Sequence, residues 1–550
     1  MGSSGPDVRV EETLTRAREC FERREWRDAF TGLSSVGPAS LAIDDLERLA
    51  VAGYLTGNDD ASDDAWMRAH EKCLSGDDPV GAARCAFWLG FNLLLRGDMA
   101  GSGGWLGRAR TLLADGEHDC AVHGLLLVVE GLEQVDRGDG RSAYATFERA
   151  GAIGERFGDR DVLTLSRLGR GQSLIAQADV VRGTACLDEA MVAVIANEVS
   201  APIAGIVYCA VLLECRNIFD ARRAQEWTEA LTRWCFSQPD LVPYRGQCLV
   251  HRSEVLQFQG KWPDALEEAR RACVALAGHP AIGEAYYQQA EMHRLRGEHD
   301  AAESAYRGAS RFGREPQPGL ALLRLAQGDR ESAVASIRRV VAEAHGAIRR
   351  SRILAASAEI SLATGDRAAA RRAADELRDI AATVDAPLLV AVASHTEGSV
   401  LVAEGEPGRA LPMLRAALTF WQRLGAPYES AHERALIAAA CRQLGDEEAG
   451  RLEFDQARTM FEALGAAPDV AAIDALVDAT TSGKSLPGGL TTREAEVLKL
   501  VSSGLSNHDI GVALVVSDHT VRRHLQNIFA KVGVSSRAAA TAYAFEHGLA

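Results

Sequence analysis

A turn signature that recurs at a nearly constant spacing is the feature that most constrains how this chain of 550 residues can fold. A small or turn-forming residue is followed by a polar residue and then by an alanine-rich amphipathic stretch. Between positions 57 and 260 the intervals are 40, 41, 40, 41 and 41 residues. Such a period is typical of repeat proteins. The signature begins at Gly57, Gly97, Gly138, Ala178, Phe219, Gly260, Gly297, Gly328, Gly365, Gly405 and Gly445, with an earlier copy at Arg24.

Each repeat has the chemistry of a helical hairpin. In one unit, Gly260 can take the left-handed conformation that ends a helix, and Pro263 suits the first turn of the next one. Asp264 places negative charge at the positive end of that helix. Strand signals are nearly absent. Small residues then follow at helical spacing and predict close packing of a neighbouring helix: Ala265, Ala269 and Ala272.

The repeats resemble a tetratricopeptide-like superhelix. With the later copies included, the intervals range from 31 to 41 residues. The spacing therefore lies between the period of about 34 residues of that family and the roughly 40–47 residues of HEAT and armadillo units. The turn followed by alanines resembles the start of the second tetratricopeptide helix, which favours that family. We therefore expect an all-α chain: a tetratricopeptide-like α-solenoid of about twelve hairpins over residues 11–478, after a disordered tail at 1–10.

A stack of hairpins offers a concave groove to a peptide, a helix or a small effector. The array is equally compatible with an interaction scaffold that has no discrete pocket. The sequence does not indicate which side chains line the groove, so it identifies no effector-binding residue.

Composition narrows the classes of protein that the chain can belong to. The chain has 60 Lys and Arg against 76 Asp and Glu, a net charge of −16, which excludes a general nucleic-acid coat. We expect a cytoplasmic protein without a membrane partner, because no apolar run approaches the roughly 20 residues of a membrane span and no secretion signal is visible. Eleven scattered cysteines with no CxxC pair predict reduced core thiols rather than disulfides or a zinc site.

The composition changes after the array. Residues 479–489 are rich in Gly, Ser, Thr and Pro and predict a flexible linker. The sequence Gly483-Lys484-Ser485 superficially resembles a phosphate-binding loop, but Asp478 stands where that loop needs glycine. We therefore expect no nucleotide site, no metal and no cofactor.

Residues 490–550 predict four short helices. Thr492 can cap the first, over Arg493–Ser503, and Gly504 ends it. Ser506 caps a second short helix. Ser517 caps a third helix over 518–532, which Gly533 ends, and Ser536 opens the last.

The third helix has two distinct faces at about 100° per residue. Its apolar face is formed by Val521, Leu525, Ile528, Phe529 and Val532, and the adjacent polar arc by His519, Arg522, Arg523 and Gln526; Thr520, His524 and Asn527 lie farther round. An arginine can bond to guanine and a glutamine to adenine in the major groove, so this arc suits DNA reading. A solvated basic face on an ordinary small helical domain is the alternative.

The segment resembles the LuxR-type helix-turn-helix. The similarity covers the opening LTTREAEVL at 490–498, the second helix GLSNHDIG at 504–511, and the recognition helix and its exit at 517–537. It implies base reading by Arg522, Arg523 and Gln526. From their places on the same helix, His519 and Asn527 are predicted to contact DNA as well. The resemblance further implies phosphate contacts by Ser506, Asn507, Thr520 and Lys531, and a dimer contact through Ala538, Ala542 and Phe545. Two residues depart from the pattern: Gly511, which could loosen the second helix, and Arg523, which bears on sequence preference.

The charge distribution agrees with local DNA binding. Residues 484–550 contain seven Lys or Arg and five Asp or Glu, a net charge of +2, so the other 483 residues carry −18. From this asymmetry we hypothesise that the acidic array holds the C-terminal domain off DNA until a partner or effector shifts it. Weaker DNA binding by the intact chain than by residues 484–550 alone would support this.

The sequence leaves three classes of function for this chain. The favoured one is a sequence-specific transcription regulator that binds double-stranded DNA as a homodimer. The second is a scaffold whose C-terminal domain docks on another regulator or on RNA polymerase. An enzyme is not expected, because no HExxH pair and no Ser, His and Asp set within an α/β frame is found. The regulator hypothesis requires Arg522 and Arg523 to face outward without being locked against acidic neighbours.

Overall fold

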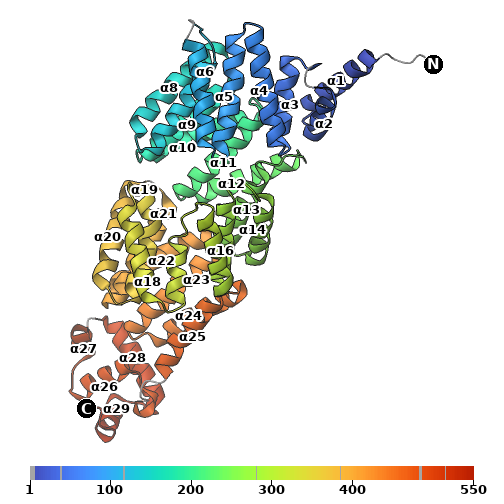
Figure 1. Cartoon of the computed structure of the whole chain (residues 1–550). Coiled ribbons are helices and arrows are strands. Elements are labelled where there is room, and N and C mark those ends of the chain that lie inside the picture. Colours follow the sequence, from blue (N-terminus) through green and yellow to red (C-terminus); the bar gives the residue numbers. More distant parts are fainter. Residues whose placement is uncertain are drawn as a thin grey trace. The chain divides into compact units, whose positions relative to one another are not determined.

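The computed structural model describes residues 6–37, 40–114, 118–238, 240–279, 281–384, 386–481, 486–514 and 516–550. Within these ranges the chain forms helices, turns and loops and contains no β-strand. Figure 1 shows the helices of the chain, coloured along the sequence. The chain divides into two compact units, Met1–Glu397 and Gly398–Ala550. Among the described residues, no helix is both long enough and apolar enough to cross a lipid bilayer.

Helices α1 to α24 pair as twelve consecutive hairpins, followed by α25. The first six hairpins are α1 (Pro6–Glu22) with α2 (Trp26–Ser35), α3 (Ile43–Leu55) with α4 (Asp59–Ser75), α5 (Pro79–Leu95) with α6 (Met99–Ala114), α7 (Val122–Asp136) with α8 (Gly140–Phe157), α9 (Arg160–Ala176) with α10 (Val180–Ile195), and α11 (Ala201–Asn217) with α12 (Ala221–Phe236). The others are α13 (Arg245–Phe258) with α14 (Trp262–Ala275), α15 (Ile282–Leu295) with α16 (His299–Arg311), α17 (Gly319–Ala326) with α18 (Arg330–Glu343), α19 (Ala347–Ala363) with α20 (Arg367–Thr383), α21 (Pro387–Glu404) with α22 (Pro407–Leu424), and α23 (Pro427–Gln443) with α24 (Glu447–Leu464), before α25 (Ala467–Thr481).

The recurring sequence signature is the turn inside each hairpin. All twelve predicted turn positions have a positive φ, between 59° and 86°, including the non-glycine residues Arg24, Ala178 and Phe219. The next residue is often an aspartate that caps the second helix. In one such turn, the Asp139 carboxylate accepts a hydrogen bond from the Ser142 amide at 3.1 Å. A single residue of positive φ, Gly138, therefore separates the C-cap of α7, Arg137, from the N-cap of α8, Asp139, and the chain reverses over very few residues.

The alanine stripes lie where they were predicted. Ala265, Ala269 and Ala272 of α14 are fully buried, and α14 packs against both α13 and α15. Because an alanine side chain is small, it lets neighbouring helices approach closely. The predicted α-solenoid of tetratricopeptide-like hairpins, followed by a four-helix domain, is confirmed.

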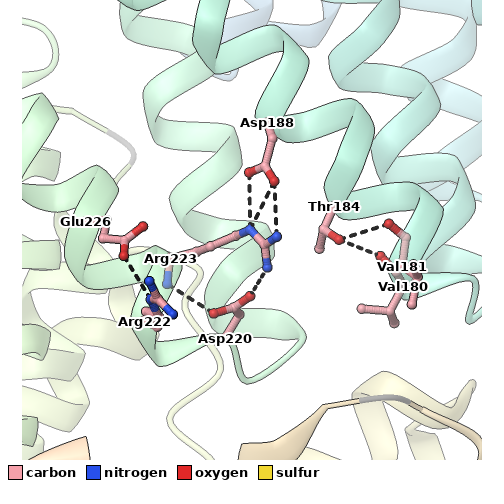
Figure 2. Close-up of polar contacts among 8 residues, drawn as sticks. All are labelled: Val180, Val181, Thr184, Asp188, Asp220, Arg222, Arg223 and Glu226. Carbon is pink, nitrogen blue, oxygen red and sulfur yellow. Dashed lines mark hydrogen bonds and ion pairs between the residues drawn. The ribbon is translucent and has the colours of Figure 1, made fainter.

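Ion pairs add links between neighbouring hairpins, as Figure 2 shows for Arg223. Asp220 caps α12 by accepting a hydrogen bond from the Arg223 amide at 3.0 Å, and it also binds the Arg223 guanidinium. The same guanidinium reaches Asp188 of α10 with N–O distances of 3.0 to 3.3 Å. These two carboxylates raise the pKa of Arg223. One arginine thus connects the turn of one hairpin to the second helix of the preceding hairpin.

Two predicted boundaries differ from the structure. Helix α1 begins at Pro6, so the expected disordered tail at 1–10 overlaps its first turn, and residues 1–5 lie outside the described residues. Of the expected linker 479–489, α25 extends to Thr481 and Pro487–Gly489 forms a short 3₁₀ turn. Residues 482–485, with Gly483-Lys484-Ser485, lie outside the described residues. All eleven cysteines have free thiols; seven of them are buried and four are half-buried.

The second unit ends in four helices that share a core of their own. They are α26 (Thr492–Ser502), α27 (Asn507–Leu514), α28 (Asp518–Val532) and α29 (Arg537–Glu546). All ten buried apolar residues of this core come from Leu490 to Ala544, and they include Val497 and Leu498 of α26 and Ile528 of α28. The segment after the array is therefore a separate small helical domain within this unit.

The turn geometry predicts opposite effects for two Ala→Gly substitutions. Ala178 has a φ of 65°, a conformation that costs an L-residue about 1–2 kcal/mol, whereas Ala185 is an exposed residue inside α10. We expect Ala178→Gly to leave stability unchanged or raise it by up to about 1 kcal/mol, and Ala185→Gly to lower it by about 0.5–1 kcal/mol. Urea denaturation followed by circular dichroism measures both. A loss of stability in Ala178→Gly as large as in Ala185→Gly would contradict the proposed role of the turn.

Candidate nucleic-acid interface

Helix α26 is fixed at its start by a capping box. The Thr491 hydroxyl accepts a hydrogen bond from the Glu494 amide at 3.2 Å, and the Glu494 carboxylate accepts one from the Thr491 amide at 2.8 Å. The cap is therefore Thr491 and not the predicted Thr492, because the helix begins one residue earlier. Glu494 is 3% exposed and also binds the Lys531 ammonium at 2.7 Å. This buried carboxylate connects α26 to the end of α28.

Helix α27 begins as predicted. The Ser506 hydroxyl accepts a hydrogen bond from the Asp509 amide at 3.2 Å, and the next residue, Asn507, accepts one from Arg537 at 2.8 Å. Gly511 is buried, and a Cβ atom there would lie 2.7 Å from the carbonyl oxygen of Val516. Gly511 therefore lets α27 approach the backbone that leads into α28, so this departure from the family pattern tightens the packing where loosening was expected.

Helix α28 has the predicted ends and the predicted apolar face. The Ser517 hydroxyl accepts a hydrogen bond from the Thr520 amide at 3.2 Å, and Gly533 ends the helix with a φ of 70°. Val521, Leu525 and Ile528 are buried, and Phe529 and Val532 pack against the same core. Burial of this face holds the opposite face of the helix toward solvent.

The predicted polar arc is exposed. Its side chains carry hydrogen-bond donors that can reach a ligand. They are His519, Arg522, Arg523 and Gln526, with Asn527 beside them. Arg522 has no hydrogen bond or ion pair within the described residues, so its five N–H donors are available. Thr520 is half-buried, and its hydroxyl lies 2.8 Å from that of Ser517.

Arg523 contacts the start of α24 in the same unit. Its guanidinium lies 3.6 Å from the Asp446 carboxylate and 3.3 Å from the Glu448 carboxylate. The adjacent Gly445 turn lies against Arg493, because a Cβ atom at Gly445 would come within 2.5 Å of that side chain. The Arg523 side chain nevertheless keeps 51% of its surface exposed. Exposed ion pairs of this kind contribute only about 0–1 kcal/mol, so Arg523 is paired and not locked.

Two residues of α28, Lys531 and His524, have surroundings that the sequence did not predict. Lys531, an expected phosphate contact, has its ammonium engaged by Glu494, although such a group carries three donors. His524 is only 6% exposed, and its Nε2 has no partner within the described residues. Burial lowers the pKa of His524, while the nearby Glu494 carboxylate opposes this shift. By its helical spacing His524 lies outside the apolar face of α28, and it is the packing of the domain that buries this side chain.

The last helix presents an apolar face to solvent. Ala538, Ala542 and Phe545 of α29 are spaced by one and two turns, and all three are exposed, Phe545 to 65%. They lie opposite the buried Ala540 and Ala544, which belong to the core. This arrangement leaves the expected dimer contact uncovered.

Comparison with known families identifies this domain. Residues 489–544 match the sequence model of the bacterial regulatory proteins of the luxR family. The C-terminal domain is a LuxR-family helix-turn-helix. Helices α27 and α28 cover the segments that the sequence predicts to be its second helix and its recognition helix. The match ends before the last residues of α29 and leaves the repeat array outside it.

Curated relatives of the chain include proteins named as helix-turn-helix regulators. A protein of Mycobacterium bovis and one of Mycobacterium tuberculosis, both named as HTH-type transcriptional regulators, are 32% identical over 197 residues, which is 34% of this chain and 20% of each relative. The response regulator protein VraR of Staphylococcus aureus is 43% identical over 60 residues, 11% of this chain and 29% of that protein. The chain thus spans a fifth to under a third of the length of these relatives.

The chain is also similar to solved structures, with low TM-scores. The APC/C hetero-tetramer Cut9–Hcn1 matches with a TM-score of 0.37 at 13% identity, covering 84% of this chain and 96% of that one. A tetratricopeptide repeat protein from Parabacteroides merdae matches with a TM-score of 0.28 at 16% identity, covering 57% and 97%.

Because His524 is buried, we expect the stability of α28 to depend on pH. Since the pKa of His524 in the folded domain lies below the unfolded value of about 6.5, the unfolded state binds the extra proton first. Stability is therefore complete above about pH 6.5 and falls as the pH drops through that value. We expect hydrogen exchange of α28, corrected for intrinsic rates, to accelerate between pH 7 and pH 5. His524→Gln should remove this dependence, and an equal dependence in that variant would assign it to another group.

Proposed function

We propose that this protein is a transcription regulator that binds double-stranded DNA sequence-specifically, with α28 in the major groove. The observation that carries the proposal is the pair of faces on α28, one buried in the domain core and one exposing Arg522, Arg523 and Gln526. The family match over residues 489–544 supports it. A bacterial regulator of this kind acts in the cytoplasm, and the proposal involves no catalysis and no cofactor.

Each exposed side chain has a proposed task. Arg522 and Arg523 bond to guanine, and Gln526 bonds to adenine. His519 and Asn527 flank these contacts. Ser506, Asn507 and Thr520 lie at the starts of α27 and α28, where backbone amides also face an anion, so they suit phosphate contacts that fix the register. Lys531 adds positive charge at the far end of α28 with the donors that Glu494 leaves free.

The exposed face of α29 supplies the proposed dimer contact. Ala538, Ala542 and Phe545 form an apolar strip that a second copy can cover with its own. A two-fold dimer places two recognition helices on two half-sites of duplex DNA. The competing hypothesis, a scaffold that docks on RNA polymerase or another regulator, would use the same strip but would not need Arg522.

Substitution of Arg522 tests base reading. We expect Arg522→Ala to cost about 1–3 kcal/mol on the preferred site and to relax the preference at one base position. Selection from a random duplex pool, followed by binding titrations over a range of salt concentrations, measures both effects. Arg149→Ala removes an exposed arginine of α8 and serves as the control. Binding that is insensitive to salt, or an unchanged base preference in Arg522→Ala, would favour the scaffold.

We further propose that the array modulates DNA binding through the acidic start of α24. Asp446 and Glu448 contact one of the base-reading arginines, so DNA and these carboxylates compete for Arg523. Asp446 also caps α24 by accepting a hydrogen bond from the Ala449 amide at 3.2 Å. The carboxylate that neutralises Arg523 is therefore fixed by a turn of the array, and a shift of this hairpin would release the arginine.

Neutralising these two carboxylates should strengthen DNA binding. Asp446→Asn with Glu448→Gln keeps an N-cap residue and similar shapes but removes both charges. We expect affinity for the preferred site to rise about threefold to tenfold, because an exposed pair is worth up to about 1 kcal/mol and two negative charges are lost near the phosphates.

The matched control is Asp329→Asn with Glu331→Gln. These residues occupy the same two positions at the start of α18, where the Asp329 carboxylate accepts a hydrogen bond from the Ser332 amide at 3.1 Å. The control should leave affinity nearly unchanged. Equal gains in both double variants would show a general charge effect and contradict modulation through α24.

A further inference from the structure

The first unit contains an open cavity that the proposed DNA-binding function does not use. The cavity has a volume of about 540 Å³ and is lined by residues of α1 to α5, α9 and α11 and of the loop before α11. Small-molecule sites usually measure about 300–1,000 Å³. All of its lining residues lie between positions 21 and 202, far in sequence from the helix-turn-helix.

Aromatic rings form much of the wall. Trp66 and Trp88 stack with ring centres 6.4 Å apart, and Phe21 meets Trp26 edge to face at 5.3 Å. Tyr54 completes the set. Trp rings in such walls attract cations, because the face of an aromatic ring carries negative charge.

Contacts from a distant segment hold two of these rings in place. The Trp26 indole donates a hydrogen bond to Gln238 at 2.9 Å, and the Tyr54 hydroxyl lies 3.1 Å from that of Tyr244. Gln238 and Tyr244 flank the connection between α12 and α13. The wall is therefore built before a ligand arrives, which lowers the entropic cost of binding.

The charged residues of the lining leave an excess of negative charge. Glu22, Asp44 and Asp161 have no ion pair within the described residues, and burial raises the pKa of Asp161. Two of the remaining charged residues form ion pairs with neighbours outside the lining: Glu47 with Arg84, and Arg48 with Asp45. Arg24 donates a hydrogen bond to the neutral Asn197, so its positive charge offsets one of the three carboxylates and two negative charges remain.

One polar side chain in the lining has no partner in the protein. The Asn92 side chain is 5% exposed, lines the cavity and makes no hydrogen bond to a described residue. Polar groups with little access to bulk water are nearly always hydrogen-bonded, so the Asn92 amide is free to bond to a molecule in the cavity.

We propose that this cavity binds a small organic cation, an ammonium group attached to a planar apolar body, and that this ligand is the effector of the array. The rings receive the apolar body and face the positive charge, Asp44 and Asp161 neutralise it, and Asn92 accepts or donates the remaining hydrogen bond. An anionic ligand would meet uncompensated carboxylates and is disfavoured.

Calorimetric titration of the full chain without DNA tests the site independently of the proposed regulatory function. The probe is 2-phenylethylammonium, and 2-phenylethanol is its neutral match in size. We expect saturable binding of the cation with one site per chain, and binding of the alcohol at least about tenfold weaker, because a charge-assisted hydrogen bond is lost.

Variants locate the binding. Asp44→Asn and Asp161→Asn should each weaken the cation about tenfold and leave the alcohol unchanged. Asp60→Asn, on α4 but outside the lining, is the control and should change neither. Circular dichroism verifies the fold of each variant, and the exposed position of Asp44 makes its variant independent of core stability. No saturable binding, equal binding of cation and alcohol, or full affinity in both lining variants would overturn the proposal.

Discussion

The fold of this chain depends on a reversal of direction that takes two residues. A residue with positive φ ends one helix, and the residue after it starts the next, often as an aspartate whose carboxylate accepts the first free amides. Repeated twelve times, this turn sets the spacing of the hairpins and brings the alanine stripes together. The position tolerates Ala178 and Phe219, so the demand is for the conformation, and glycine meets it at the lowest cost.

Helix α28 is held by two different interactions. Its apolar residues, Val521, Leu525 and Ile528, bury one face, which leaves the arginines outward. The buried Glu494 then caps α26 and binds Lys531, so one carboxylate fixes both the start of α26 and the end of α28. Rotation of α28 would break this pair and expose the core, which makes the outward arc a consequence of the packing.

The structure shows which acidic residues of the array lie close to the C-terminal domain. Net charge alone says that the array repels DNA. The second unit brings two of its carboxylates, Asp446 and Glu448, to within 3.6 Å of Arg523. A weak, exposed pair at this point fits the proposed modulation, in which DNA or a shift of one hairpin breaks it. The proposed cation site lies within the first hairpins of the array, outside the residues that match a known family.

The sequence by itself determined the elements and their faces, because helix caps, turn residues and apolar periodicity act over a few residues. It predicted the twelve turns, the ends of α28 and the exposed arc of Arg522 and Gln526. Only the tertiary structure decided that His524 is buried, that Arg523 meets α24 and that Lys531 binds Glu494. It also assembled the cavity from Trp26, Trp88 and Asp161. These arrangements join residues from separate helices, and their distances depend on how the hairpins stack, which no local pattern encodes.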